Sequence, residues 1–165
     1  MKCLIVSGDP TVDVMCFRDL NSPLLQRELD AMEQWTRLRK VFHVFRDHPQ
    51  HDKLLNNGLF CVHSQLDRHL ATRAQQLARP VKTSAKKTQE SDFEGVLWEI
   101  LRTNITQHDS YRCSSDVYRV GHVPFPSERG KGGGFVGCKR PCTGADVPTC
   151  PVECRPPNHI DWAYC

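Results

Sequence analysis

The sequence predicts an α/β fold, a sheet with flanking helices that is followed by a disulfide-rich, loop-like C-terminal extension. Two short β-prone runs, residues 12–17 and 41–45, each lead into an Arg-Asp pair. A helical pattern lies between them, as in a strand–helix–strand unit. Five of the nine cysteines fall in the last 28 residues, among prolines and glycines. The first two observations predict the sheet, and the third predicts the extension.

Composition excludes several classes of protein. The chain has 165 residues, of which 39% are hydrophobic and 25% charged, as in an ordinary globular domain. Its 22 basic and 19 acidic residues lack the basic excess of a nucleic-acid binder. No stretch approaches the roughly 18 apolar residues of a membrane span. We therefore expect no nucleic-acid partner and no transmembrane segment.

The clustered cysteines indicate the compartment. Zinc binding, the alternative, favours C-x2-C knuckles, whereas the tail has C-x3-C twice. We expect disulfides, and therefore a secretory protein of the Golgi lumen or the extracellular space. The sequon at Asn104 agrees with a glycoprotein. The first residues do not form a signal peptide, so we expect an incomplete piece of a secretory parent. The tail cysteines are Cys138, Cys142, Cys150, Cys154 and Cys165.

The elements follow in order. Residues 4–6 predict a strand, and residues 12–17 a second one. Ser22 as N-cap and Pro23 at the first helical position begin a helix over residues 23–38. Its apolar stripe contains Leu25, Leu29, Met32 and Trp35. Residues 41–45 close the unit as a neighbouring parallel strand, which places Asp19 and Asp47 at one edge of the sheet.

The rest of the chain is less regular. We predict a second helix over residues 59–77, a flexible loop at 80–91 and a third helix from 91 to about 101. Beyond Asn104 we expect irregular chain with one short edge strand at 135–137. Cys3, Cys16 and Cys61 are interpreted as small apolar residues. The domain boundaries are 1–137 for the α/β part, with N-terminal strands missing, and 138–165 for the tail.

Two polar clusters are candidates for a site. Asp19-Leu20-Asn21 has the form D-x-N after a strand, which suits a divalent ion such as Mn²⁺ or Mg²⁺ beside a diphosphate. The alternative is that both residues cap the next turn. In the second cluster, Asp47 with His48 and His51 offers either metal ligands or a base for an acceptor hydroxyl. The alternative there is an Arg-Asp pair beside two solvated imidazoles. His108 and Asp109, in a loop after a helix, supply a third contact.

These stretches resemble a family. The blocks FRDLNS, RELDAMEQW and FHVFRDHPQH are similar to the motifs RD-x-DS, RE-x-x-A-x-x-x-W and FHVMRDHP-x-H of a poorly characterised glycosyltransferase-like family. Its members occur in bacterial polysaccharide clusters and in invertebrate secretory proteins. QHDSYRC, PFPSER and CPVECRPPNHIDWAYC resemble its later blocks. The resemblance covers most of residues 9–53 and 107–165, and it implies a partial GT-A-like (Rossmann-type) sheet.

The resemblance also implies roles for single residues. The donor is expected to be a nucleotide sugar and the acceptor a glycan or protein. Asn21 departs from the family's usual Asp, and LNNGLFCVHSQ replaces a glycine- and tryptophan-rich segment. The implied metal ligands are Asp19 and Asn21, the implied cofactor contacts are Arg18 and Arg46, and the implied catalytic residues are Asp47, His48, His51, His108 and Asp109.

Two functions follow from the sequence. The first is a glycosyltransferase-like protein that transfers a sugar from a nucleotide sugar, with little or no catalysis expected from this chain. The second is a non-catalytic, secreted, Cys-rich binding module.

Overall fold

The computed structural model describes residues 9–56, 58–77, 98–113, 120–130, 132–142 and 147–165. Four sequence predictions lie outside these residues: the strand at 4–6, the loop at 80–91, the environment of Cys3 and most of the third helix. Only the end of that helix, residues 98–101, falls within the described part, where it is helical.

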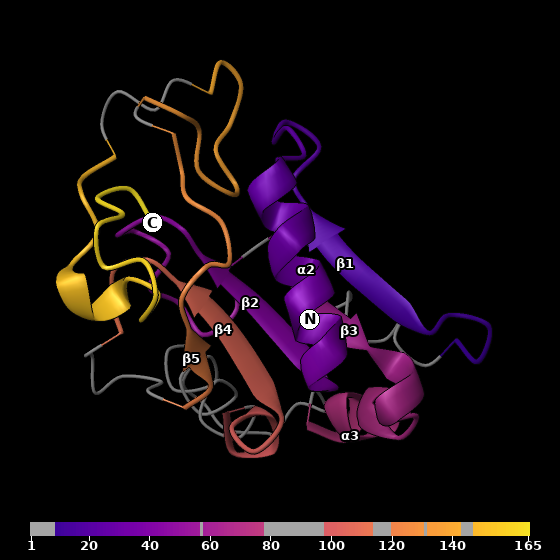
Figure 1. Ribbon diagram of the computed structural model, residues 1–165. Coiled ribbons are helices and arrows are strands. Elements are labelled where there is room, and N and C mark those ends of the chain that lie inside the picture. Colours follow the sequence, from indigo (N-terminus) through magenta and orange to yellow (C-terminus); the bar gives the residue numbers. More distant parts are fainter. Residues whose placement is uncertain (1–8, 57, 78–97, 114–119, 131, 143–146) are drawn as a thin grey trace, which may run out of the picture.

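A five-stranded mixed sheet forms the centre of the molecule (Figure 1). The strands lie in the order β1-β3-β2-β4-β5. β3 is antiparallel to both of its neighbours, whereas β2, β4 and β5 run parallel to one another. The α/β class is therefore confirmed. The strands are β1 (Val14–Arg18), β2 (Phe42–Arg46), β3 (Leu59–His63), β4 (Ile105–Asp109) and β5 (His122–Val123).

The position of β3 corrects two predictions. Residues 59–63 were expected to begin a helix, but they form a fully buried strand, and α3 (Leu70–Leu77) begins only afterwards. A short, continuous apolar run such as LFCV cannot be assigned to helix or strand by periodicity. The expected adjacency of β1 and β2 was also wrong, because β3 lies between them. Both strands still run in the same direction, so Asp19 and Asp47 follow strands that end at the same edge of the sheet.

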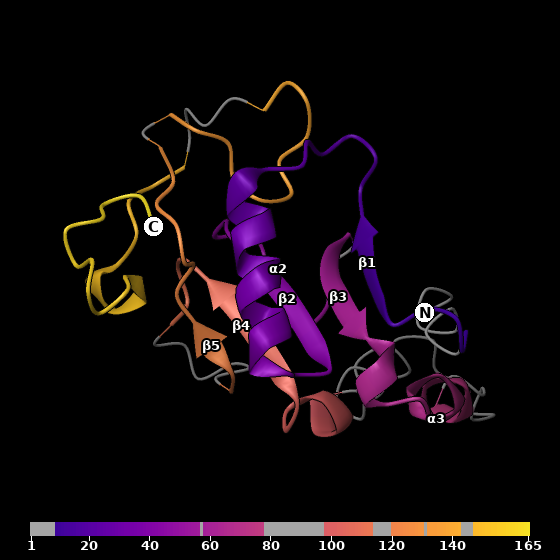
Figure 2. The ribbon, with the colours of Figure 1, turned by 45° about the vertical axis from the view of Figure 1, so that its right-hand side comes forward.

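Helix α2 (Gln26–Leu38) crosses one face of the sheet (Figure 2). Its start differs from the prediction, since Leu25 is the N-cap and makes no side-chain capping bond. Just before the helix, Arg18 Nη2 donates to the carbonyl oxygen of Pro23. The buried face also differs, since Leu29 is 40% exposed. The residues that α2 buries are Arg27, Glu28, Ala31 and Trp35.

Alternation along the strands builds a core on each face. On the α2 side, Phe45 and Cys61 pack with Ala31 and Trp35 of the helix. On the opposite side, the cluster contains Phe42, Val44, Phe60, Val62 and Ile105 from the sheet, with Leu54, Leu70 and Leu101 from other segments. Successive residues of a strand point to opposite faces, and the two cores together bury both faces of β2, β3 and β4. No helix in the described part of the chain is long and apolar enough to cross a membrane.

Strand β4 was missed by the sequence prediction. Residues 105–109 were expected to be irregular, yet all five are buried and pair in parallel with residues 42–46 of β2. Its sequence, ITQHD, is mostly polar and therefore gives no apolar pattern typical of a strand. The strand is nevertheless buried, because its polar side chains find partners inside the protein. The predicted edge strand at 135–137 does not form, and Val136 and Gly137 lie in a turn.

Four disulfides connect the described cysteines, in agreement with the predicted oxidising environment. Cys16 and Cys61, predicted to be free small residues, face each other across β1 and β3 and are joined. Cys113–Cys154 ties the tail to the end of β4. Cys138–Cys142 and Cys150–Cys165 lie within the tail, the latter spanning the short helix η3 (Val152–Cys154).

Gly58 provides a test of the turn that leads into β3. Its φ is +74°, and a Cβ there would lie 2.6 Å from the backbone N of Asp19. Gly132 has a similar φ of +72°, but a Cβ added to it would meet no atom within 4 Å, so Gly132→Ala is a matched control. Both variants incur about 1–2 kcal/mol of left-handed strain. We expect a clearly larger loss of unfolding free energy for Gly58→Ala, measured in urea. Equal losses would show that the contact with Asp19 relaxes freely.

Candidate functional site

The carboxylate of Asp47 is the centre of a buried hydrogen-bond network. Arg27 donates to both of its oxygens, from Nε to Oδ2 and from Nη2 to Oδ1, each at 3.1 Å. Arg129 Nη1 (3.3 Å) and Ser110 Oγ (2.8 Å) approach Oδ1, and the backbone N of Val136 donates to Oδ2 at 3.0 Å. Asp47 has no exposed surface. This predicted catalytic carboxylate is therefore fully occupied with joining α2, β4 and the C-terminal segment.

The two arginines predicted to contact a nucleotide sugar both bond to partners within the protein. Arg46 is buried, and its guanidinium donates to Gln107 Oε1 at 2.7 Å and to three carbonyl oxygens of the loop after β2. This loop, residues 48–55, is therefore shaped around a cation. Arg18 makes a bidentate pair with Glu28, with Nε–Oε1 at 2.7 Å and Nη2–Oε2 at 2.8 Å. That pair connects the end of β1 to the first turn of α2.

His108 also lies inside the protein, beneath α2. Its Nδ1 is 2.6 Å from His43 Nε2, and its Nε2 is 2.7 Å from Gln34 Oε1. Burial, and then the charge of Arg27, lowers the pKa of His108 to about 3, and burial lowers the pKa of His43 well below its ordinary value. Both rings are therefore neutral. Since Gln34 Oε1 only accepts, His108 Nε2 carries a proton, and His43 Nε2 donates to His108 Nδ1.

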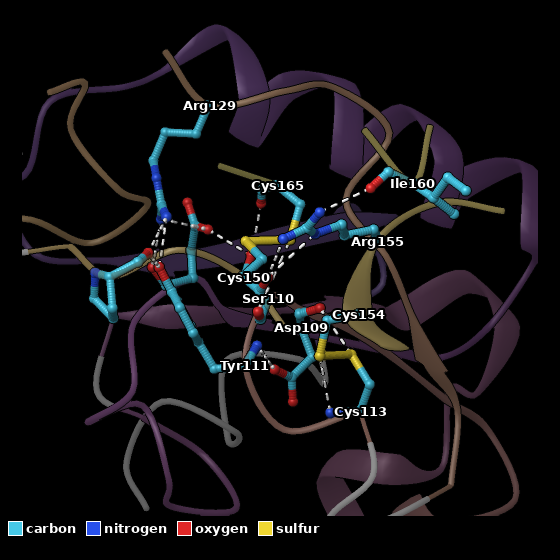
Figure 3. The surroundings of a disulfide bond; sticks show 12 residues. Asp109, Ser110, Tyr111, Cys113, Arg129, Cys150, Cys154, Arg155, Ile160 and Cys165 are labelled. Atoms are coloured by element: carbon cyan, nitrogen blue, oxygen red, sulfur yellow. Dashed lines mark hydrogen bonds and ion pairs between the residues drawn. A yellow bond between two sulfur atoms is a disulfide. The ribbon is translucent and has the colours of Figure 1, made fainter. Parts of the chain in front are cut away.

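The tail lies beside β4 and β5, and Asp109, the last residue of β4, is next to it (Figures 1 and 3). Asp109 Oδ1 accepts from the backbone N of Tyr111 and of Arg112, each at 2.8 Å. Its Oδ2 lies 3.2 Å from His122 Nδ1. The Ser110 hydroxyl also approaches the carbonyl oxygen of Cys165 at 2.9 Å. Asp109 thus holds a turn, and Ser110 links Asp47 to the tail.

A pocket of about 280 Å³ opens at the carboxyl edge of β1. It contains two of the predicted site residues, Asp19 and His51, which the folded chain brings together. Three segments form it: the turn after β1, the loop before β3 and the segment after Val136. The backbone N of Arg140 donates to the carbonyl oxygen of Asn21 at 3.1 Å, which ties the last segment to the first. The lining residues are Asp19, Ser22, His51, Lys53, Asn56, Gly58, Leu59, Gly137 and Lys139.

Three lining residues hold buried polar atoms without a partner in the described part of the chain. They are Ser22 Oγ, His51 Nδ1 and Asn56 Nδ2. Ser22 and Asn56 are each only 8% exposed. A buried polar group without a hydrogen bond costs about 1–3 kcal/mol. These three atoms have almost no accessible surface, so they are packed behind the wall of the pocket and a ligand does not contact them directly. Burial, with smaller effects from His48 and Arg46, lowers the pKa of His51 to about 4, so its imidazole is neutral at pH 7.

His48 lies beside this pocket. Its ring contacts Phe135, with centroids 4.5 Å apart, and His51, with centroids 5.6 Å apart. Through Phe135, the C-terminal segment therefore packs against the predicted histidine pair.

The predicted divalent-metal ligands do not match the donors that such an ion prefers. Asp19 Oδ1 accepts from the backbone N of Asn21 at 3.0 Å, and Oδ2 pairs with Lys139 Nζ at 3.3 Å. Asp19 is the single carboxylate of a pocket that also contains two lysines. Mn²⁺ and Mg²⁺ sites are built from carboxylates and water, so we derive no step through a metal. Elsewhere in the described residues, Asp109, Cys113 and Cys154 cluster, but these two cysteines form a disulfide.

Several site residues carry no usable signal in the sequence. Ser22 was interpreted as a helix cap, and Asn56 was not predicted to be a site residue. Lys139 lies between two cysteines, 120 positions after Asp19, and reaches it only in the folded chain. Arg27 and Arg129 resemble surface cations in the sequence, although both are buried against Asp47. These contacts join distant segments, so no local pattern could have predicted them.

Comparisons with family models, with curated proteins and with solved structures find no match to this chain. The arguments about function therefore rest on the residues themselves.

Asp47→Asn tests the buried network. It leaves two buried guanidinium groups without their counter-charge, so we expect the unfolding free energy to fall by about 3–5 kcal/mol in urea denaturation. The matched control is Glu33→Gln, which removes the exposed pair with Arg37 and should change stability by less than about 1 kcal/mol. A similar small loss for both variants would contradict the structural role of Asp47.

The buried histidines predict how stability depends on pH. Their pKa values are lowered on folding, so below about pH 6.5 the unfolded chain binds protons that the folded chain does not. Stability should be constant above that pH and fall steadily from about pH 6.5 to 4. His108→Gln should reduce this slope, by up to about 1.4 kcal/mol per pH unit for one proton. An unchanged slope in urea titrations at several pH values would show that His108 is not buried as a neutral ring.

Proposed function

We propose that this protein is a glycosyltransferase-like sugar-binding protein of the secretory pathway, with a GT-A-like sheet, whose substrate enters the pocket at the carboxyl edge of β1. The parent reaction is transfer of a sugar from a nucleotide sugar to a glycan or protein acceptor. The pocket carries the proposal, because it gathers hydroxyl, amide, imidazole and charged groups at one edge of the sheet. Ligands of open α/β sheets bind at this edge.

The size and chemistry of the pocket support a sugar. Its volume of about 280 Å³ is just below the roughly 300–1,000 Å³ of pockets for drug-sized ligands, so it suits a single ring. Ser22, Asn56 and His51 contribute a hydroxyl, an amide and an imidazole to its wall. His51 is a neutral imidazole and orients a hydroxyl, a role that Asp47 cannot take because its oxygens are occupied.

One observation favours the second candidate, a non-catalytic secreted binding module. Three groups predicted to be catalytic serve the fold: Asp47 holds two arginines, Asp109 holds a turn, and His108 bonds His43 and Gln34. The pocket remains without them, so binding requires none of these groups. Among the described residues that line it, the carboxylate suited to act as a base is Asp19, which is paired with Lys139.

The experiment uses the oxidised protein with uridine- and guanosine-diphosphate sugars, with and without Mn²⁺, and with glycan acceptors. We expect binding by calorimetry and slow release of nucleotide. His51→Ala should reduce both at least tenfold, because it removes a lining group of the pocket. His69→Ala, an exposed histidine before α3, is the matched control and should have no effect.

The outcomes separate the two candidates. Binding of sugars without any nucleotide release favours the binding module. Turnover that is insensitive to His51→Ala places the chemistry outside this pocket. Absence of both binding and turnover overturns the proposal.

A further inference from the structure

Asn104 is an exposed residue in the one Asn-x-Ser/Thr triplet of the sequence, Asn104-Ile105-Thr106. It lies in the turn between the helical residues 98–101 and strand β4. Its N–H donates to the carbonyl oxygen of Leu101 at 2.8 Å, and its carbonyl oxygen accepts from the N–H of Phe42 at 2.9 Å. Because the backbone groups are bonded within the fold and the residue is exposed, the side-chain amide faces solvent.

The compartment suits a modification of this amide. The four disulfides fit an oxidising, secreted environment. In the secretory pathway, an asparagine of such a triplet accepts an oligosaccharide from a lipid diphosphate carrier. The asparagine Nδ2 forms a bond to the anomeric carbon of the first sugar and releases a proton to water. The bond from that carbon to the diphosphate oxygen breaks, and the lipid diphosphate leaves.

The third residue of the triplet is hidden in the folded protein. Thr106 is only 2% exposed and lies in β4, opposite His43 of β2. The triplet is recognised through the hydroxyl of its third residue, and here that residue is inside the sheet. Recognition therefore requires a chain in which β4 has not yet paired with β2. The completed fold accommodates the attached sugar, because Asn104 itself is exposed.

The attachment point lies away from the pocket. Strands β1, β2 and β4 run in the same direction, and the pocket opens at the carboxyl edge of β1. Asn104 precedes the amino end of β4. Figure 1 shows that the start of β4 is at the end of the strand far from the C-terminal tail. A glycan on Asn104 is therefore attached at the end of the sheet opposite the pocket.

We propose that Asn104 carries an N-linked glycan, which is added before β4 enters the sheet and which leaves the pocket accessible. The inference depends on an oxidising secretory compartment, and it does not depend on which ligand the pocket binds.

The first experiment directs the chain into a eukaryotic secretory pathway with a cleavable leader and treats the recovered protein with peptide N-glycosidase. We expect a loss of mass equal to one glycan, with an aspartate left in place of Asn104. Asn104→Gln and Thr106→Val should abolish this change, whereas Thr106→Ser keeps the hydroxyl and should retain it. Asn158→Gln alters an exposed asparagine outside any such triplet, so it is the matched control and should retain it too.

The second experiment tests when the glycan is added. Detergent-solubilised microsomes, which supply the enzyme and the lipid-linked oligosaccharide, are mixed with unglycosylated protein, either folded and oxidised or reduced and alkylated. We expect the alkylated chain to be modified at least tenfold more than the folded protein, because only the unfolded chain presents the Thr106 hydroxyl. Equal modification of both forms would overturn the order of events.

The remaining outcomes separate this inference from the proposed function. Protein from the secretory pathway that loses no mass, or a loss that persists in Asn104→Gln, overturns the inference. Sugar affinity measured by calorimetry should be the same for the glycoprotein and for Asn104→Gln, and a difference would show that the glycan reaches the pocket. A glycosylated protein that binds no sugar would leave this inference standing while the proposed function fails.

Discussion

The structure depends on one buried carboxylate. Asp47 accepts hydrogen bonds from Arg27, Arg129, Ser110 and the amide of Val136, and these donors come from α2, from the end of β4 and from the C-terminal half of the chain. A buried ion pair is stabilising only when its hydrogen bonds are satisfied. The hydrogen bonds of Asp47 are satisfied only when segments that lie far apart in the sequence are folded together. The carboxylate therefore determines where the tail and the pocket lie.

The pocket is a consequence of this arrangement. Val136 donates to Asp47, and the residues that follow reach the turn after β1, where Gly137 and Lys139 line the pocket with Asp19. From the other side, Arg46 gathers the carbonyl oxygens of the loop that supplies His51 and Lys53. Two neighbouring residues of one motif, Arg46 and Asp47, thus hold different segments in place. Together they position the walls of the pocket without lining it.

A motif in the sequence need not be the site itself. The run from Arg46 to His51 concentrates charged and imidazole groups, and the prediction assigned catalysis to most of them. In the folded protein, burial divides them: Arg46 and Asp47 hold segments together, while His48 and His51 lie at or beside the pocket. Dense polar motifs are suited to such roles because a buried charge requires several partners.

The sequence by itself determined the α/β class, the strands around residues 14–18 and 42–46, the central helix and the oxidised tail, because periodicity and cysteine spacing are local signals. It also singled out Asp19 and His51, which both line the pocket in the folded chain. Tertiary structure alone decided that β3 separates β1 from β2 and that polar β4 is buried beside β2. It also decided that Lys139 meets Asp19. Pairing between distant segments depends on which partners satisfy buried groups, and no local pattern encodes that choice.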